Sequence, residues 1–197
     1  MAIDPQICAG CGSCAAACPT GAASYAVPPV DTLMGRVRTL VRTYSAAGGR
    51  DPVLLVHDAD HGGPLLDALA RFGNGLPANV IPVQVNEVGQ VGAEVIGAAF
   101  AYGAAGVHLL LRERPKHDLD GVRGTIELAN TILSGLGFGI GPASLIQVDD
   151  PDLLRAALDR IPLGQATAHP ASFVPIGTKR GVATLAMREL YLSLIHI

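Results

Sequence analysis

All four cysteines of this 197-residue chain stand in its first eighteen residues, at Cys8, Cys11, Cys14 and Cys18. Pro19 follows the last of them, so the spacing is C-x2-C-x2-C-x3-C-P. This run is typical of an iron–sulfur site, because its short gaps let one tight turn direct three thiolates toward the same cluster. Small residues between the cysteines let the backbone come close and donate N–H groups to cluster sulfurs. The sequence therefore predicts that these four cysteines bind a [4Fe–4S] cluster, with Pro19 ending the short helix that carries Cys14 and Cys18.

Zinc binding and disulfide formation are the two alternatives. A zinc site usually has two C-x2-C pairs separated by about a dozen or more residues, and this chain has no second pair. Disulfides form in oxidising compartments, and the sequence shows no secretory signal. Because every cysteine lies in one motif, the cytoplasm is the expected location.

Residues 3–25, which contain IDPQICAGCGSCAAACPTGA, resemble one half of a bacterial two-cluster ferredoxin. In that family the first three cysteines of a run bind one cluster and the fourth binds the other. The resemblance implies that Cys8, Cys11 and Cys14 share a cluster and that Cys18 serves a second one. Residues 2–6 look like the strand before the later of two runs, so we expect the natural protein to continue upstream. In the alternative, all four cysteines hold one cluster, which is awkward because Cys14 and Cys18 lie one helical turn apart.

The composition restricts the possible partners and the location of the chain. The formal charge is −3 and basic residues do not cluster, so nothing indicates nucleic-acid binding. No apolar run reaches the roughly 18 residues that span a bilayer. Hydrophobic residues make up 49% but aromatic residues only 4%, which predicts a core of Ala, Val, Leu and Ile.

We expect four regions along the chain. Residues 1–30 form the ferredoxin-type segment, 31–49 a connecting helix, 50–161 an α/β domain, and 162–197 an irregular segment with a final helix over 178–192. The last residues, 192–197 (LSLIHI), look like translated sequencing adapter and are left out of the fold prediction. On the connecting helix Arg36, Arg38 and Arg42 lie mostly off the apolar face, where they form either a solvated face or a docking surface for an acidic redox partner.

Strand and helix patterns alternate after residue 50. Short apolar runs predict buried strands over 52–57, 80–85, 107–111 and 144–148, and amphipathic or Ala-rich segments predict helices over 64–72, 91–102, 121–136 and 151–160. Alternation with short connections predicts a parallel sheet covered on both faces. The fold class is therefore α/β: a ferredoxin-like cluster-binding segment followed by a flavodoxin-like, doubly wound parallel sheet.

Polar loops follow the first three strands, over residues 57–63, 86–89 and 112–118, and should open on one edge of the sheet. Three uses of this edge are possible. One is a metal site made of His57, Asp58, Asp60 and His61. Another is a flavin phosphate site at the turn of residues 62–63, although the loop lacks a Ser/Thr-rich cradle. We favour the third, a charged surface that docks a partner.

Residues 52–160 also resemble the delta (iron–sulfur) subunit of methyl-viologen-reducing hydrogenase. The matching stretches are VLLVHDADHGG, NVIPVQVNEVGQVGAEVIGAAFAYGAAGVHLL and GTIELANTILSGLGFGIGPASLIQV. In that family cysteines in the edge loops hold a [2Fe–2S] cluster. Here Asp58, Asp60, Asn86 and Arg112 stand near those positions, so the resemblance implies an electron-transfer assembly without that cluster.

Together these observations predict a subunit that passes single electrons through a [4Fe–4S] cluster to or from a larger oxidoreductase complex, of the hydrogenase and heterodisulfide reductase kind. The alternative is a flavin- or metal-binding oxidoreductase domain that receives electrons from the cluster. No serine, histidine or cysteine arrangement in the sequence suggests a nucleophile, so no catalytic residue is expected.

Overall fold

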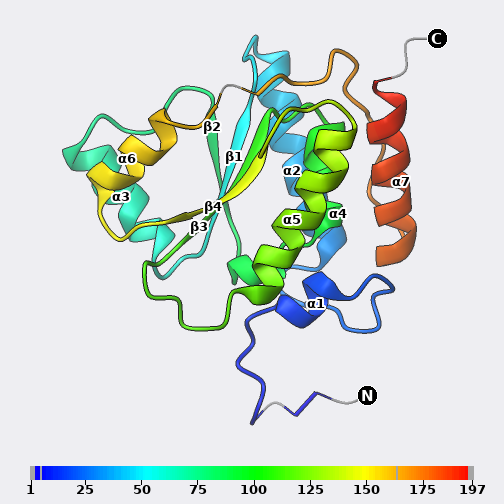
Figure 1. Ribbon diagram of the computed structural model, residues 1–197, viewed down its shortest axis with the longest axis horizontal. Helices are drawn as coiled ribbons and strands as arrows, with labels where there is room; N and C mark the ends of the chain where they lie inside the picture. Colours follow the sequence, from blue (N-terminus) through cyan, green and yellow to red (C-terminus); the bar gives the residue numbers. More distant parts are fainter. Residues whose placement is uncertain (1–2, 5, 163, 195–197) are drawn as a thin grey trace.

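The computed structural model describes residues 3–4, 6–162 and 164–194. Within these residues the chain is an α/β structure with four strands in one parallel sheet and seven α-helices (Figure 1). The helices are α1 (Ser13–Ala17), α2 (Val30–Ala46), α3 (Gly62–Phe72), α4 (Ala93–Ala101), α5 (Asp120–Gly135), α6 (Pro151–Asp159) and α7 (Lys179–Leu192). The strands are β1 (Val53–His57), β2 (Val80–Gln84), β3 (Gly106–Leu111) and β4 (Ala143–Gln147), and a short 3-10 turn, η1 (Val88–Gln90), precedes α4.

The strand order in the sheet is β2-β1-β3-β4, and every neighbouring pair is parallel. Val53 pairs with Val80 on one side and with Gly106 on the other, so β1 lies in the middle. All five residues of β1 are buried, whereas the edge strands β2 and β4 are only partly buried. Continuous apolar runs therefore mark the central strands, as expected for a sheet covered on both faces.

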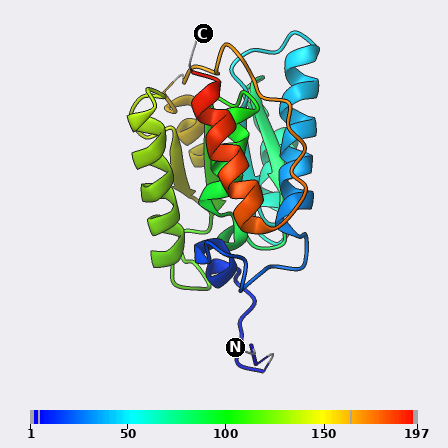
Figure 2. The same cartoon turned by 90° about the vertical axis from the view of Figure 1, so that its right-hand side faces the viewer.

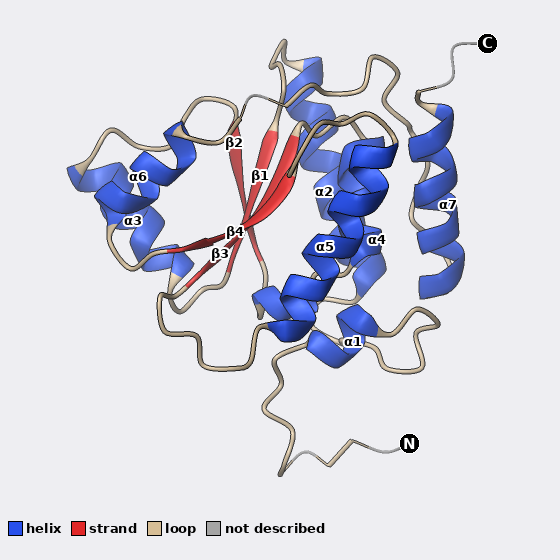
Figure 3. Cartoon of the chain, in the orientation of Figure 1, coloured by secondary structure: helices blue, strands red, loops and turns tan. Residues whose placement is uncertain are grey.

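Helices cover both faces of the sheet, and one face carries an additional layer (Figure 3). Helices α3 and α6 pack on one face over a small core around Leu55, Leu69 and Leu154. Helices α2, α4 and α5 lie on the other face and enclose the larger core. Figure 2 shows α7 crossing in front of α4, between α5 and α2.

Helix α4 is buried on all sides because α7 covers the face that the sheet does not. Every residue from 94 to 101 is buried, including Glu94. Gly97 lets Met187 of α7 approach, since a Cβ on Gly97 would lie 2.5 Å from the Met187 Cε atom. A helix that is apolar on all faces belongs in a core, which explains the Ala-rich sequence of this segment.

The strands and helices expected from the sequence are confirmed, with bounds that differ by a few residues. Two local predictions differ from the structure. Ile3, Asp4 and Gln6 form no strand, and the remaining residues of the expected 2–6 strand lie outside the described part. Cys18 caps α1 in an extended conformation instead of lying inside it, because Pro19 ends the helix one residue earlier than expected. The residues 195–197 of the expected adapter tail are outside the described part.

The arginines of α2 donate hydrogen bonds to backbone carbonyls, a structural role that the sequence did not predict. Arg36 donates to the backbone carbonyl of Gln84 at 2.7 Å. Arg38 donates to the carbonyls of residues 172 and 173, and Arg42 to that of residue 171. Arg36 thus links α2 to the end of β2, and Arg38 and Arg42 fasten the irregular segment before α7 to α2. Within the described residues, no helix combines the length and the apolar character needed to cross a membrane.

Truncating the centre of the larger core should destabilise the fold. Phe100 is fully buried and meets Phe138 edge-on, with ring centroids 5.2 Å apart. We expect Phe100→Ala to lower the free energy of unfolding by about 3–5 kcal/mol through lost contacts and a cavity, measured by urea denaturation. The control is Phe72→Ala, whose ring is 87% exposed, and it should change the free energy by less than about 0.5 kcal/mol. Equal losses in the two variants would contradict the assigned core.

Candidate iron–sulfur site

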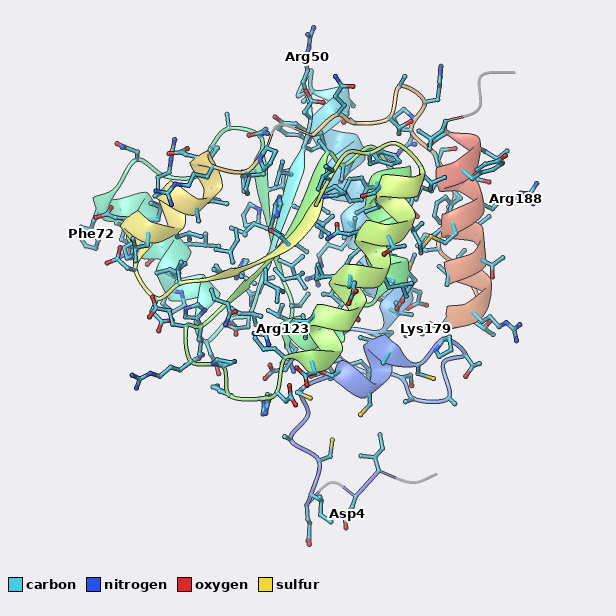
Figure 4. The ribbon with its side chains drawn as sticks, viewed as in Figure 1. Asp4, Arg50, Phe72, Arg123, Lys179 and Arg188 are labelled. Atoms are coloured by element: carbon cyan, nitrogen blue, oxygen red, sulfur yellow. The ribbon has the colours of Figure 1, made fainter. Side chains whose placement is uncertain are left out.

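The cysteine motif forms a short loop, helix α1 and the turn after it, at the end of the molecule where the strands finish (Figure 1). Gly10 and Gly12 take positive φ values of 71° and 82°, a conformation that favours glycine. All four cysteines are free thiols; Cys8 and Cys14 are exposed, and Cys11 and Cys18 are partly buried. Figure 4 shows sulfur atoms around α1 and along the chain that leads into it.

Three of the four cysteines line one pocket. This pocket measures about 430 Å³, and Cys8, Cys11 and Cys14 contribute to its wall together with small and apolar neighbours. Those neighbours include Ile3, Ile7, Gly10, Gly12, Ala15 and Ala23. Cys18 is not among the residues that line the pocket. The ferredoxin resemblance implies that the fourth cysteine serves a different cluster, and this assignment of Cys18 stays a prediction.

The donor set and its surroundings fit an iron–sulfur cluster. No three His, Cys, Asp or Glu side chains of the described residues are placed to hold a single metal ion. A cubane presents its iron atoms at separate corners, so its thiolates stand farther apart than the ligands of one ion. Thiolates, a mainly apolar wall and nearby backbone N–H groups are the environment that such a cluster requires.

Backbone N–H groups already point at two of the sulfur atoms. The Gly10 N–H donates to Cys8 Sγ at 3.4 Å, and the Ala23 N–H donates to Cys18 Sγ at 3.4 Å. The Ala23 bond is the main reason that the pKa of Cys18 falls to about 6, and the Thr20 hydroxyl, 3.5 Å from the same sulfur, adds to it. Cys18 is therefore largely a thiolate at neutral pH, which is the form that binds iron.

Two glycines bring the motif into direct contact with the α/β domain. A Cβ on Gly12 would lie 2.8 Å from the backbone of Gln90, and a Cβ on Gly89 would overlap the carbonyl oxygen of Cys11. Tyr25 adds a polar link, since it donates to the Gly10 carbonyl at 2.9 Å and accepts from Asn86 at 2.7 Å. The turn after β2 therefore fixes the position of Cys11. The contact between the cysteine loop and this turn was not predicted from the sequence. Gly12 and Gly89 are the residues that could have indicated it.

The three polar loops open on one edge of the sheet, as predicted, and they meet the cysteine motif there. A pocket of about 50 Å³ is lined by residues from all three loops and by Cys11 and Ser13. The four positions implied by the hydrogenase-subunit resemblance, Asp58, Asp60, Asn86 and Arg112, all contribute to this pocket. The edge of the α/β domain thus lies directly beside one of the cysteines.

The side chains at this edge have local partners. Asp58 accepts from the N–H groups of His61 and Gly62, at 2.6 and 3.1 Å. His61 Nε2 lies 3.0 Å from an oxygen of Asp149, and Lys116 lies 3.3 Å from Asp60. This pocket is smaller than the sites of about 300–1,000 Å³ that enclose small-molecule ligands, and residues 62–63, the expected flavin phosphate turn, are not among those that line it. The edge carries charged side chains of both signs.

The Gly89 contact should be intolerant of a side chain. We expect Gly89→Ala to displace the Cys11 backbone and to lower the free energy of unfolding by about 1–3 kcal/mol, measured by urea denaturation. The control is Gly63→Ala, because a Cβ there would meet its nearest atom only at 3.9 Å and should be tolerated. Unchanged stability in Gly89→Ala would contradict the tight packing of the two segments.

The depressed pKa of Cys18 should be measurable in the cluster-free protein. The alkylation rate of Cys18, followed by mass spectrometry, should rise with pH around a midpoint near 6, because the thiolate is the reactive form. Thr20→Val removes one donor and should move the midpoint upward, whereas Ser24→Ala, which removes a hydroxyl nearby in the sequence, should not. A parent midpoint near the ordinary value of about 8.5 would contradict the hydrogen bonds assigned to this sulfur.

Comparison with known protein families assigns the N-terminal part of the chain. Residues 1–24 match the family model described as "4Fe-4S binding domain". A comparison with curated proteins finds no match to the chain. The matched residues include all four cysteines and the loop that carries Gly10 and Gly12. Residues 1–24 are therefore a 4Fe–4S binding domain, and a 4Fe–4S cluster is the cofactor of this protein.

Proposed function

We propose that this chain is an electron-transfer protein, or a subunit of a larger oxidoreductase, that exchanges single electrons with a partner protein. The observation that carries the proposal is the pocket lined by Cys8, Cys11 and Cys14 inside the 4Fe–4S binding domain. When bound, the cluster supplies a one-electron redox centre. The chain's own residues hold it, surround it with N–H donors and present it at the surface.

In this proposal Cys8, Cys11 and Cys14 bind one cluster, and Cys18 serves a second cluster. Two features support that division. Cys18 does not line the pocket of the other three cysteines. Its sulfur lies within hydrogen-bond distance of the Thr20 hydroxyl and the Ala23 N–H, which lower the pKa of its thiol.

The surroundings of the pocket support docking of a partner next to the cluster. Ile3 is 58% exposed and Ile7 is 82% exposed, and both contribute to the pocket wall. Large apolar side chains at the rim of a redox site favour a protein surface that covers them. A covered rim also excludes water, which lowers the local dielectric constant and affects the reduction potential.

We further propose that residues 50–161 form a flavodoxin-like, doubly wound domain, with residues 1–30 as the cluster segment, 31–49 as a connecting helix and 162–197 as a separate C-terminal region. The strand order β2-β1-β3-β4 supports this, because it follows the flavodoxin order over four strands. The resemblance to the hydrogenase delta subunit favours a complex of the hydrogenase and heterodisulfide reductase kind. With all four cysteines in one motif, a reducing compartment such as the cytoplasm is the proposed location.

Iron and acid-labile sulfide per chain, measured after anaerobic reconstitution, test this function. We expect about four irons in the parent, most of them retained in Cys18→Ser and largely lost in the matched variant Cys14→Ser. Loss of the cluster in Cys18→Ser to the same extent as in Cys14→Ser would show that all four cysteines serve one site. Zinc in place of iron and sulfide would overturn the electron-transfer function itself.

A further inference from the structure

A buried lysine from the far end of the sequence contacts the helix between Cys14 and Cys18. Lys179 is the first residue of α7, and its side chain is only 9% exposed. Its Nζ atom donates to the carbonyl oxygen of Ala15 and, at 3.1 Å, to that of Ala16. Figure 4 shows Lys179 at the end of α7 that lies next to α1.

The carbonyls that Lys179 contacts lack partners within their own helix. In an α-helix the Ala15 carbonyl would accept from the N–H of residue 19. Residue 19 is Pro19, which has no N–H, and α1 ends at Ala17. Ala15 and Ala16 are partly buried, and a carbonyl removed from water without a donor is costly. Lys179 therefore completes the end of α1, which the proline of the cysteine motif leaves open.

The charge of Lys179 is balanced by a buried carboxylate. Glu94 of α4 is 7% exposed, and its Oε1 lies 3.3 Å from Lys179 Nζ. Burial raises the pKa of Glu94, and the neighbouring ammonium opposes that rise. The ammonium of Lys179 and the carboxyl group of Glu94 thus lie close to the cysteine helix, in a region where a low dielectric constant makes charge interactions strong.

We propose that Lys179 is a positioning residue for the cluster site: it fixes the helix between Cys14 and Cys18, and its charge, partly offset by Glu94, favours the reduced cluster. This inference rests on the proposed function, because it assumes a cluster on Cys8, Cys11 and Cys14. Reduction takes one electron from an external reductant, which is oxidised, and makes the cluster site more negative. A nearby cation lowers the free energy of that state, and a nearby carboxylate raises it.

A double-mutant cycle tests the proposed electrostatic effect, because the two single variants should shift the equilibrium constant for cluster reduction in opposite directions. Lys179→Met removes the cation while keeping most of its volume, and Glu94→Gln removes the carboxylate in nearly the same shape. At one mildly alkaline pH we expect Lys179→Met to decrease the equilibrium constant for reduction about tenfold, which is about 59 mV for a one-electron couple. Glu94→Gln should increase the equilibrium constant for reduction, and in the double variant this constant should return toward the parent value.

The double variant also keeps the test independent of a folding failure. Removing one partner of a buried ion pair can destabilise strongly, whereas replacing both by neutral residues is often tolerated. The charge control is Arg188→Met, an exposed arginine on the same helix, which should leave the potential unchanged. Shifts of the same sign in both single variants, or no shift in either, would overturn the electrostatic role.

The positioning part is tested in the cluster-free protein by amide hydrogen exchange. The Cys18 N–H donates to the Cys14 carbonyl at 3.2 Å, at the C-terminal end of α1. Its exchange should become faster in Lys179→Met and remain as in the parent in Arg188→Met. Unchanged exchange would overturn the positioning role. A parent protein that binds no iron would instead refute the proposed function, so the two failures are distinguishable.

Discussion

The structure depends on the contact between the cysteine loop and the turn that follows β2. Gly12 lies against the backbone of Gln90, and Gly89 lies against the carbonyl of Cys11. Each segment thus has a glycine at the point where a side chain would collide with the other segment. Backbone packed this closely leaves no space for a side chain and little freedom to shift. The loop that must hold a metal cluster is therefore supported by a parallel sheet, whose strand ends are rigid because β1 and β3 are buried.

The sheet edge and the cluster segment form one continuous site. Cys11 and Ser13 line the small pocket at the carboxyl ends of the strands, beside Asp58, Asn86 and Arg112. In open parallel sheets this edge, where the strand order reverses, is where ligands and partners bind. A partner that docks on the charged loops would lie next to Cys11. The part of the chain that forms the sheet therefore contributes to the surroundings of the cysteine motif, even though it carries no cysteine of its own.

Local patterns predicted most of the fold, and long-range contacts account for what they missed. Apolar runs and capping residues such as Asp150, which accepts from two N–H groups of α6, gave the elements and their order. The cysteine spacing identified the cofactor. The roles of Lys179 and of the α2 arginines were not predictable, because each depends on carbonyl groups more than 40 residues away in the sequence. The Ala-rich sequence of α4 signalled burial, but nothing in it indicated that α7 would be the covering element.

The link between Lys179 and α1 also affects the order in which the protein can be assembled. The lysine and the Ala15 carbonyl are 164 residues apart, with the whole sheet between them in the sequence. During synthesis the cysteine motif is therefore made well before the lysine that completes its helix. The end of α1 gains this hydrogen bond only once α7 has been made and has packed against α4.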